Sequence, residues 1–94
     1  MSEKRDINRM VYANLSLIES ITGERPKWIH TVRLGEWYQS KWWDRAVQRA
    51  NEAGCQPVLI QRTGVGLWVA RTRTQLMPYE AWLKVLKSSG NKVL

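Results

Sequence analysis

The chain has 94 residues, enough for one domain, and a chain of this size buries only about 60–65% of the surface that its unfolded form exposes. Its 15 Lys and Arg against 8 Asp and Glu give a net charge of +7. The single cysteine, Cys55, excludes an intrachain disulfide and fits a reducing compartment. No apolar run is long enough for a membrane span, and the first residues lack the apolar stretch of a signal peptide. We therefore expect a cytoplasmic protein without membrane contact.

Four segments show clear periodicity or composition. Apolar spacing predicts a helix over residues 3–22, ended by Gly23. Residues 26–34 are rich in β-branched and aromatic side chains and predict a strand. Helical spacing returns over residues 36–53, before Gly54. The apolar run at 57–62 predicts a strand buried on both faces, with parallel pairing.

The remaining residues complete the expected fold. Two glycines at 63–66 indicate a reversal into an antiparallel strand at 67–71, and Pro78 suits the first position of a last helix. We expect an α/β fold, a small three-stranded mixed sheet with three helices in the order αβαββα. One domain is expected over residues 1–88, with a C-terminal tail over 89–94.

Most of the positive charge lies in the middle of the chain. Between Arg25 and Arg73 there are nine basic and three acidic residues, a net of +6. Such a field concentrates polyanions, and nucleic acid is the commonest polyanion in a cell. A surface that only confers solubility is the alternative.

Three of these cations repeat at helical spacing. Lys41, Arg45 and Arg49 stand at i, i+4 and i+8, so they line one face of the predicted helix. Like charges at this spacing repel by a few tenths of a kcal/mol per pair, about the size of a favourable pair. A row that costs stability favours a ligand, and a solvated basic face is the alternative.

No catalytic constellation is visible in the sequence. One His and one Cys are too few for a zinc site, and the acidic residues lack the clustered spacing of a magnesium site. A lone His30 in mid-strand is more often a structural residue than a general base. We expect no catalytic residues, no metal and no cofactor.

Four short segments of the chain are residues 42–46 (Trp-Trp-Asp-Arg-Ala), 53–54 (Ala-Gly), 57–62 (Pro-Val-Leu-Ile-Gln-Arg) and 67–69 (Leu-Trp-Val). Their order resembles the C-terminal half of phage Holliday junction resolvase-like nucleases of the PD-(D/E)XK superfamily. In those relatives a strand with Glu-x-Lys precedes a helix with Trp-Trp-x-Gln-Ala. The resemblance covers about half of the chain. It implies a restriction-endonuclease-like core and a phage origin.

The chain departs from this pattern at the catalytic positions. Thr31-Val32-Arg33 stands where the family has Glu-x-Lys, Arg45 replaces the helix Gln, and the upstream hairpin with the metal-binding Asp is absent. Without two carboxylates nothing holds Mg²⁺. We therefore expect a pseudo-nuclease that does not cleave DNA.

The former active-site face is the predicted binding surface, because guanidinium groups bind phosphate without a cofactor. Its predicted phosphate-binding residues are Arg33, Lys41, Arg45, Arg49, Arg62, Arg71 and Arg73, with Trp37 and Trp42 available for stacking on bases.

Three functions follow. The first is a non-catalytic protein that binds duplex or branched DNA. The second is a small phage protein that binds and modulates a host or phage protein through a Trp- and Arg-rich surface. The third is a surviving nuclease that uses Glu36 with an acid from a second subunit. A homodimer is also expected, because a small sheet leaves edges open.

Overall fold

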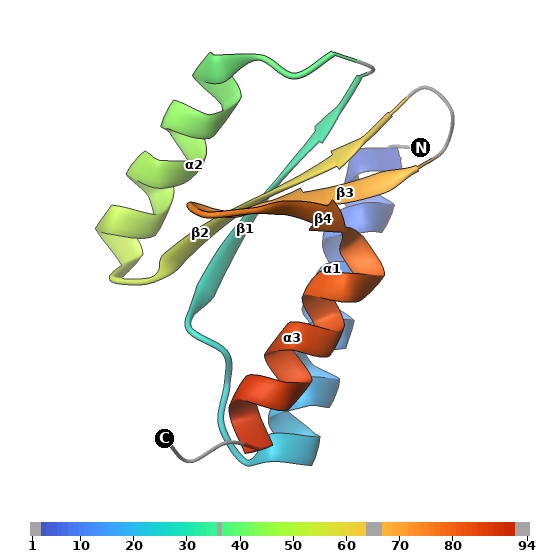
Figure 1. Ribbon diagram of the computed structural model, residues 1–94, viewed down its shortest axis with the longest axis vertical. Helices are drawn as coiled ribbons and strands as arrows, with labels where there is room; N and C mark the ends of the chain where they lie inside the picture. Colours follow the sequence, from blue (N-terminus) through green and yellow to red (C-terminus); the bar gives the residue numbers. More distant parts are fainter. Residues whose placement is uncertain (1–2, 36, 64–66, 92–94) are drawn as a thin grey trace. The chain divides into compact units, whose positions relative to one another are not determined.

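The computed structural model describes residues 3–35, 37–63 and 67–91, and within them the chain forms three helices and one four-stranded mixed sheet (Figure 1). The elements are α1 (Glu3–Thr22), β1 (Trp28–Leu34), α2 (Ser40–Ala53), β2 (Gln56–Arg62), β3 (Trp68–Arg71), β4 (Leu76–Pro78) and α3 (Tyr79–Asn91). The α/β class is as predicted, but the prediction of three strands is wrong. None of the helices in the described part is long and apolar enough to cross a membrane.

The additional strand, β4, follows a tight turn after β3. The N–H of Thr72 donates to the carbonyl of Gln75 (2.8 Å), and the Thr72 hydroxyl accepts from the N–H of Gln75 (3.2 Å). This turn folds Leu76–Pro78 back onto β3. Pro78 is thus the last residue of a strand and α3 begins at Tyr79. A proline is tolerated there because β4 lies at the edge of the sheet.

The chain divides into two compact units, residues 1–26 with 80–94, and residues 27–79. The first unit contains α1 and most of α3. The second contains the sheet and α2. The expectation of one domain over residues 1–88 stays a prediction.

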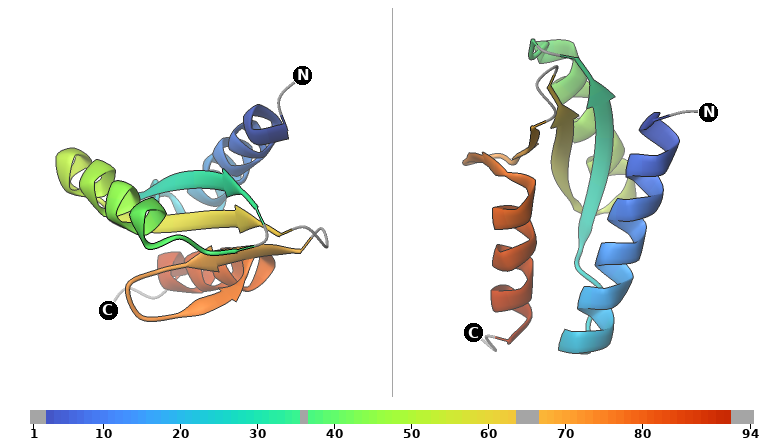
Figure 2. Two further views of the ribbon diagram at one scale, coloured as in Figure 1. Left: turned by 90° about the horizontal axis from the view of Figure 1, so that it is seen from above. Right: turned by 90° about the vertical axis from the view of Figure 1, so that its right-hand side faces the viewer.

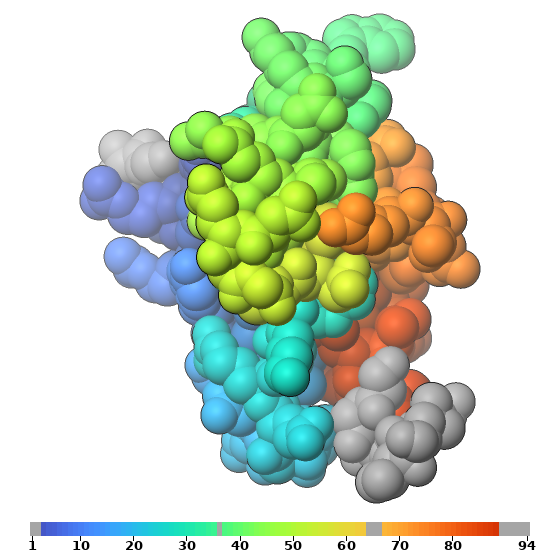
Figure 3. All heavy atoms as spheres, turned by 90° about the vertical axis from the view of Figure 1, so that its left-hand side faces the viewer, coloured from blue at the N-terminus to red at the C-terminus, as the bar shows by residue number. Residues whose placement is uncertain are grey.

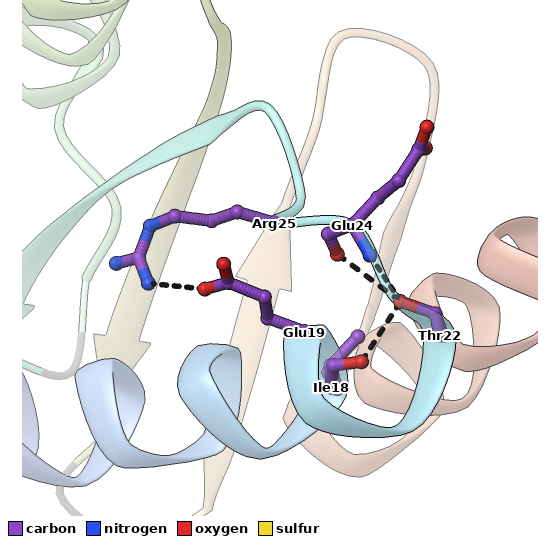
Figure 4. A network of polar contacts seen from close by, with 5 residues as sticks. All are labelled: Ile18, Glu19, Thr22, Glu24 and Arg25. Carbon is purple, nitrogen blue, oxygen red and sulfur yellow. Dashed lines mark hydrogen bonds and ion pairs between the residues drawn. The ribbon is translucent and has the colours of Figure 1, made fainter.

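In the first unit, α1 has the bounds that its periodicity predicts and buries the stripe Ile7, Val11, Leu15 and Ile18. Its end is fixed by short-range contacts (Figure 4). The Thr22 hydroxyl donates to the carbonyl of Ile18 (2.8 Å), and Arg25 forms an ion pair with Glu19 (3.3 Å).

The last helix, α3, buries Trp82 and Leu86. It continues to Asn91, and so enters the segment over 89–94 that the sequence predicts to be a tail.

In the second unit, the strand order is β1-β2-β3-β4, which can be followed by colour in Figure 2 (left). β1 and β2 pair in parallel and the other neighbours are antiparallel, as predicted. Pro57 to Gln61 on β2 are all buried, which agrees with a strand buried on both faces. The N–H of Thr63 donates to the carbonyl of Leu67 (2.9 Å) beside the predicted reversal, whose residues 64–66 lie outside the described residues.

The crossover helix α2 packs on β1 and β2. It buries Ala46 and Ala50 and ends at Ala53, before Gly54, whose φ of 68° is left-handed. The predicted start at residue 36 is wrong, because α2 begins at Ser40. The N–H of Gly35 still pairs with the carbonyl of Arg62 (3.0 Å), so the chain needs several residues to pass from the sheet to the helix layer.

Candidate functional site: a basic strip beside the edge strand

The strand register sorts the predicted site residues between the two faces of the sheet. Arg49 of α2 donates to the Thr31 hydroxyl (2.9 Å), so Thr31 faces α2. Side chains alternate along a strand, which places Arg33 on the same face. Arg71 shares this face through its position opposite Leu59, the partner of Thr31.

Arg62 lies apart from the other predicted residues. It is opposite Leu34 on β1 and Trp68 on β3, and alternation directs all three away from α2. In this register Arg62 lies on the other face of the sheet from Arg33 and Arg71, and its part in phosphate binding stays a prediction.

The outer edge of β1 exposes backbone carbonyls. The N–H of Gly35 donates to Arg62 on β2, and in a parallel pair alternate residues bond to the neighbouring strand. The carbonyls of His30 and Val32 therefore point away from β2. Because β1 is the first strand of the sheet, these two carbonyls line an edge.

Two arginines donate hydrogen bonds to these carbonyls. Arg49 donates through Nη1 to the His30 carbonyl (3.0 Å), and Arg33 donates through Nη1 to the Val32 carbonyl (2.9 Å). Acceptors two residues apart along a strand are separated by about 7 Å. Unpaired strand edges invite pairing with other chains, so these guanidinium groups protect the edge. Each has five N–H donors, which leaves further donors for a ligand.

Lys41 and Arg45 continue this row along α2. They lie about 12 and 6 Å from Arg49 toward the helix start, on the same flank of α2. Because α2 runs opposite to β1 (Figure 1), Arg45 is level with Arg33. Lys41, Arg45 and Arg49 are exposed and Arg33 is half-buried. We call these four residues the basic strip.

The basic strip is open to solvent. Figure 3 shows the outer side of α2, in green to yellow, without a strand of its own unit over it. Among the described residues, none of the four cations of the strip forms an ion pair with an acidic side chain. Their charges are therefore available to a ligand.

The two tryptophans proposed for stacking differ in exposure. Trp37 is 80% exposed, whereas Trp42 is half-buried. A Cβ on Gly35 would lie 3.2 Å from the ring of Trp42, so this ring is packed on the backbone at the end of β1. Of the two, Trp37 presents its ring to solvent.

Arg71 and Arg73 lie toward the opposite flank of α2. The guanidinium carbon of Arg71 is 3.8 Å from the centre of the Tyr38 ring, and Nε of Arg73 donates to the side chain of Gln56 (3.3 Å). Sequence reasoning missed Tyr38, since an aromatic residue before a helix does not reveal its partner. Sequence reasoning also missed Gln61, because its partner is distant in the chain. Its side chain donates to the carbonyl of Gly35 (2.8 Å).

His30 is a buried residue and not an accessible base. The residue is 4% exposed. Burial, followed by the positive charge of Arg49, lowers the pKa of His30 from 6.5 to about 4. The imidazole is therefore neutral near pH 7.

The described residues bring no metal site together. No group of three His, Cys, Asp or Glu side chains that could hold a metal ion occurs among them. Glu36, which the surviving-nuclease hypothesis needs, lies outside the described residues. The Thr31 hydroxyl accepts a hydrogen bond from Arg49, so in the described structure it is engaged with a cation.

Comparison of the chain with protein-family models, curated proteins and solved structures found no match. The arguments on function therefore rest on the residues and geometry above.

Proposed function

We propose that this chain is a non-catalytic nucleic-acid-binding protein, and that the basic strip binds the phosphates of one DNA strand. The observation that supports this most is the alignment of Arg33, Lys41, Arg45 and Arg49 along α2 and the edge of β1. The resemblance to a resolvase-like nuclease adds that this face derives from a former active site in a phage protein.

The strip has the dimensions of a phosphate-binding surface. It is about 12 Å long, and successive phosphates of one strand rise by about 3.4 Å along a duplex, so it can contact roughly four. Arg33 and Arg49 are held by the carbonyls of Val32 and His30. Binding then costs less side-chain entropy than it would with free arginines.

The same residues argue against hydrolysis. In place of the family's Glu-x-Lys the chain has a threonine hydroxyl and a guanidinium group, and neither generates a metal-bound hydroxide. Arg49 donates to Thr31. Its guanidinium group brings a positive charge to the place where the family has a metal ion.

The experiment is a titration of labelled four-way junction, linear duplex and single strand with Mg²⁺ at several salt concentrations, read on native and denaturing gels. We expect binding without cleavage. Replacing Lys41 and Arg45 by Ala removes two phosphate contacts and lowers the steepness of the salt dependence by about 2 in log K against log salt. Affinity falls by roughly tenfold or more.

The matched control changes Lys84 and Lys87, two exposed cations of α3, to Ala. This variant has the same net charge as the test variant. Equal losses in both variants, or no DNA binding at low salt, would contradict the proposal, whereas metal-dependent cleavage would revive the nuclease hypothesis.

A further inference from the structure

The opposite flank of α2 has a second surface with different chemistry. Ala46 and Ala50 face the sheet and Arg49 lies toward the edge of β1, so helical geometry turns Trp43 and Val47 toward β3. α2 packs on β1 and β2. The α2-facing side of β3 and β4 therefore extends beyond the helix.

Arg71 is the charged centre of this surface. Its guanidinium group stacks on Tyr38 at 3.8 Å. Its Nε is buried and has no hydrogen-bond partner among the described residues. Nη1 and Nη2 are not buried in this way and make no hydrogen bond to a described residue, so they reach solvent. A guanidinium group fixed by an aromatic face, with its outer N–H groups free, is prepared for a planar anion.

The surroundings of Arg71 are apolar. Leu76, opposite Arg71 on β4, is 55% exposed, and Tyr38 is 39% exposed. Pro78 is exposed and its partner Val69 is half-buried. We call Tyr38, Val69, Arg71, Leu76 and Pro78 the Arg71 surface.

This composition fits a protein partner better than a nucleic acid. Phosphate strands are bound by rows of cations, whereas the Arg71 surface has one cation, and Arg73 on the same flank donates to Gln56. A single arginine held among apolar and aromatic side chains is typical of the centres of protein interfaces. A carboxylate can accept two parallel N–H bonds from Nη1 and Nη2, and the chain's charge of +7 favours the approach of an acidic partner.

We propose that the Arg71 surface binds a protein segment in which a carboxylate side chain is flanked by apolar residues. This site is separate from the basic strip, so it stands even if the strip does not bind DNA.

The test is selection of a random peptide library, displayed on phage, against the whole protein. We expect enriched peptides with Asp or Glu beside Leu, Ile or aromatic residues. Synthetic copies should bind roughly tenfold or more weakly to the Arg71→Gln variant and unchanged to the variant with Lys41→Ala and Arg45→Ala. No enrichment, enrichment without acidic residues, or equal binding to Arg71→Gln would overturn the proposal.

A second pair of variants guards against misfolding of Arg71→Gln. Leu76→Glu places a like charge beside the incoming carboxylate and should also weaken binding by roughly tenfold or more. Leu17→Glu adds the same charge at an exposed leucine of α1, 52% exposed, and should leave binding unchanged. If instead Arg71→Gln and Leu76→Glu weaken single-stranded DNA binding and not peptide binding, the surface belongs to nucleic acid and the proposal is wrong.

Discussion

The two flanks of α2 hold their arginines in opposite ways. Toward the edge of β1, Arg33 and Arg49 donate to backbone carbonyls. Toward β3, Arg71 lies on the ring of Tyr38 and makes no hydrogen bond to a described residue. The first arrangement uses part of the N–H edge of each guanidinium group. The second covers one face and leaves the outer edge free.

This difference shows that net charge alone does not identify a partner. Near β1, cations stand in a row, an arrangement suited to a polymer of phosphates that makes contact at several points. Near β3, Arg73 is bonded to Gln56, and Arg71 stands among apolar side chains, an arrangement suited to a single anion with an apolar neighbour. Both flanks are basic in sequence, and the neighbours of each guanidinium group separate them.

Gly35→Ala should disturb both flanks and give the largest effect. The φ of Gly35 is 153° and an added Cβ would lie 3.2 Å from the Trp42 ring. Backbone strain and overpacking together cost about 3–4 kcal/mol, measured by urea unfolding. The change also shifts the segment that holds Tyr38 on Arg71, so peptide and DNA binding should fall together.

The control for this prediction is Gly54→Ala. Gly54 also has a positive φ, of 68°, but an added Cβ would have no neighbour within 4 Å. It should cost about 1 kcal/mol. Equal destabilisation by the two changes would show that the Trp42 ring is not packed against Gly35.

The pH dependence of stability should report the burial of His30 and, to a smaller extent, the charge of Arg49 beside it. The pKa of His30 is lowered to about 4 in the fold, so the unfolded chain binds a proton first as the pH falls below 6.5. The part of the unfolding free energy that depends on a neutral His30 is fully present above pH 6.5. It is lost between pH 6.5 and 4, by about 3 kcal/mol in all.

The measurement is an NMR titration, which is simple because His30 is the only histidine. Arg49→Ala should raise the pKa of His30 toward 6.5, since it removes the second cause of the lowered value. Arg45→Ala should move it less. Equal shifts would mean that Arg49 does not hold its charge at the strand edge.

The fold was predictable where the signal is local and long. α1 has the predicted bounds because four buried residues recur at helical spacing, and β2 was visible as a continuous apolar run. β4 was missed because three residues show no periodicity and pair only once β3 offers an edge. The start of α2 was misplaced because the ladder continues to Gly35 through a bond to Arg62, which is a tertiary contact.

The candidate site was predictable to the same extent. Helical spacing was enough to align Lys41, Arg45 and Arg49 on one flank of α2. It did not reveal that Arg49 binds Thr31 and a strand carbonyl, or that Arg62 faces the other side of the sheet, because both depend on the register between strands.

The smallest predicted effect is a difference in unfolding free energy between the Ala variants of two arginines on the same flank of α2. Arg49→Ala removes hydrogen bonds to the His30 carbonyl and the Thr31 hydroxyl and should cost about 1–2 kcal/mol, or several degrees in Tm for a chain of this size. Arg45→Ala, one turn away and exposed, should stay within about 0.5 kcal/mol. Both should weaken DNA binding.

Thr31→Val tests whether the hydrogen bond itself causes this difference, since valine keeps the shape of threonine without the hydroxyl. In a double-mutant cycle of unfolding free energies, Thr31→Val and Arg49→Ala should couple by about 0.5–1 kcal/mol, while Thr31→Val and Arg45→Ala should be additive. Coupling to Arg45 in place of Arg49 would mean that the two arginines exchange roles in solution. The basic strip would then be a mobile row of charge, and the contrast with the fixed guanidinium group of Arg71 would become sharper.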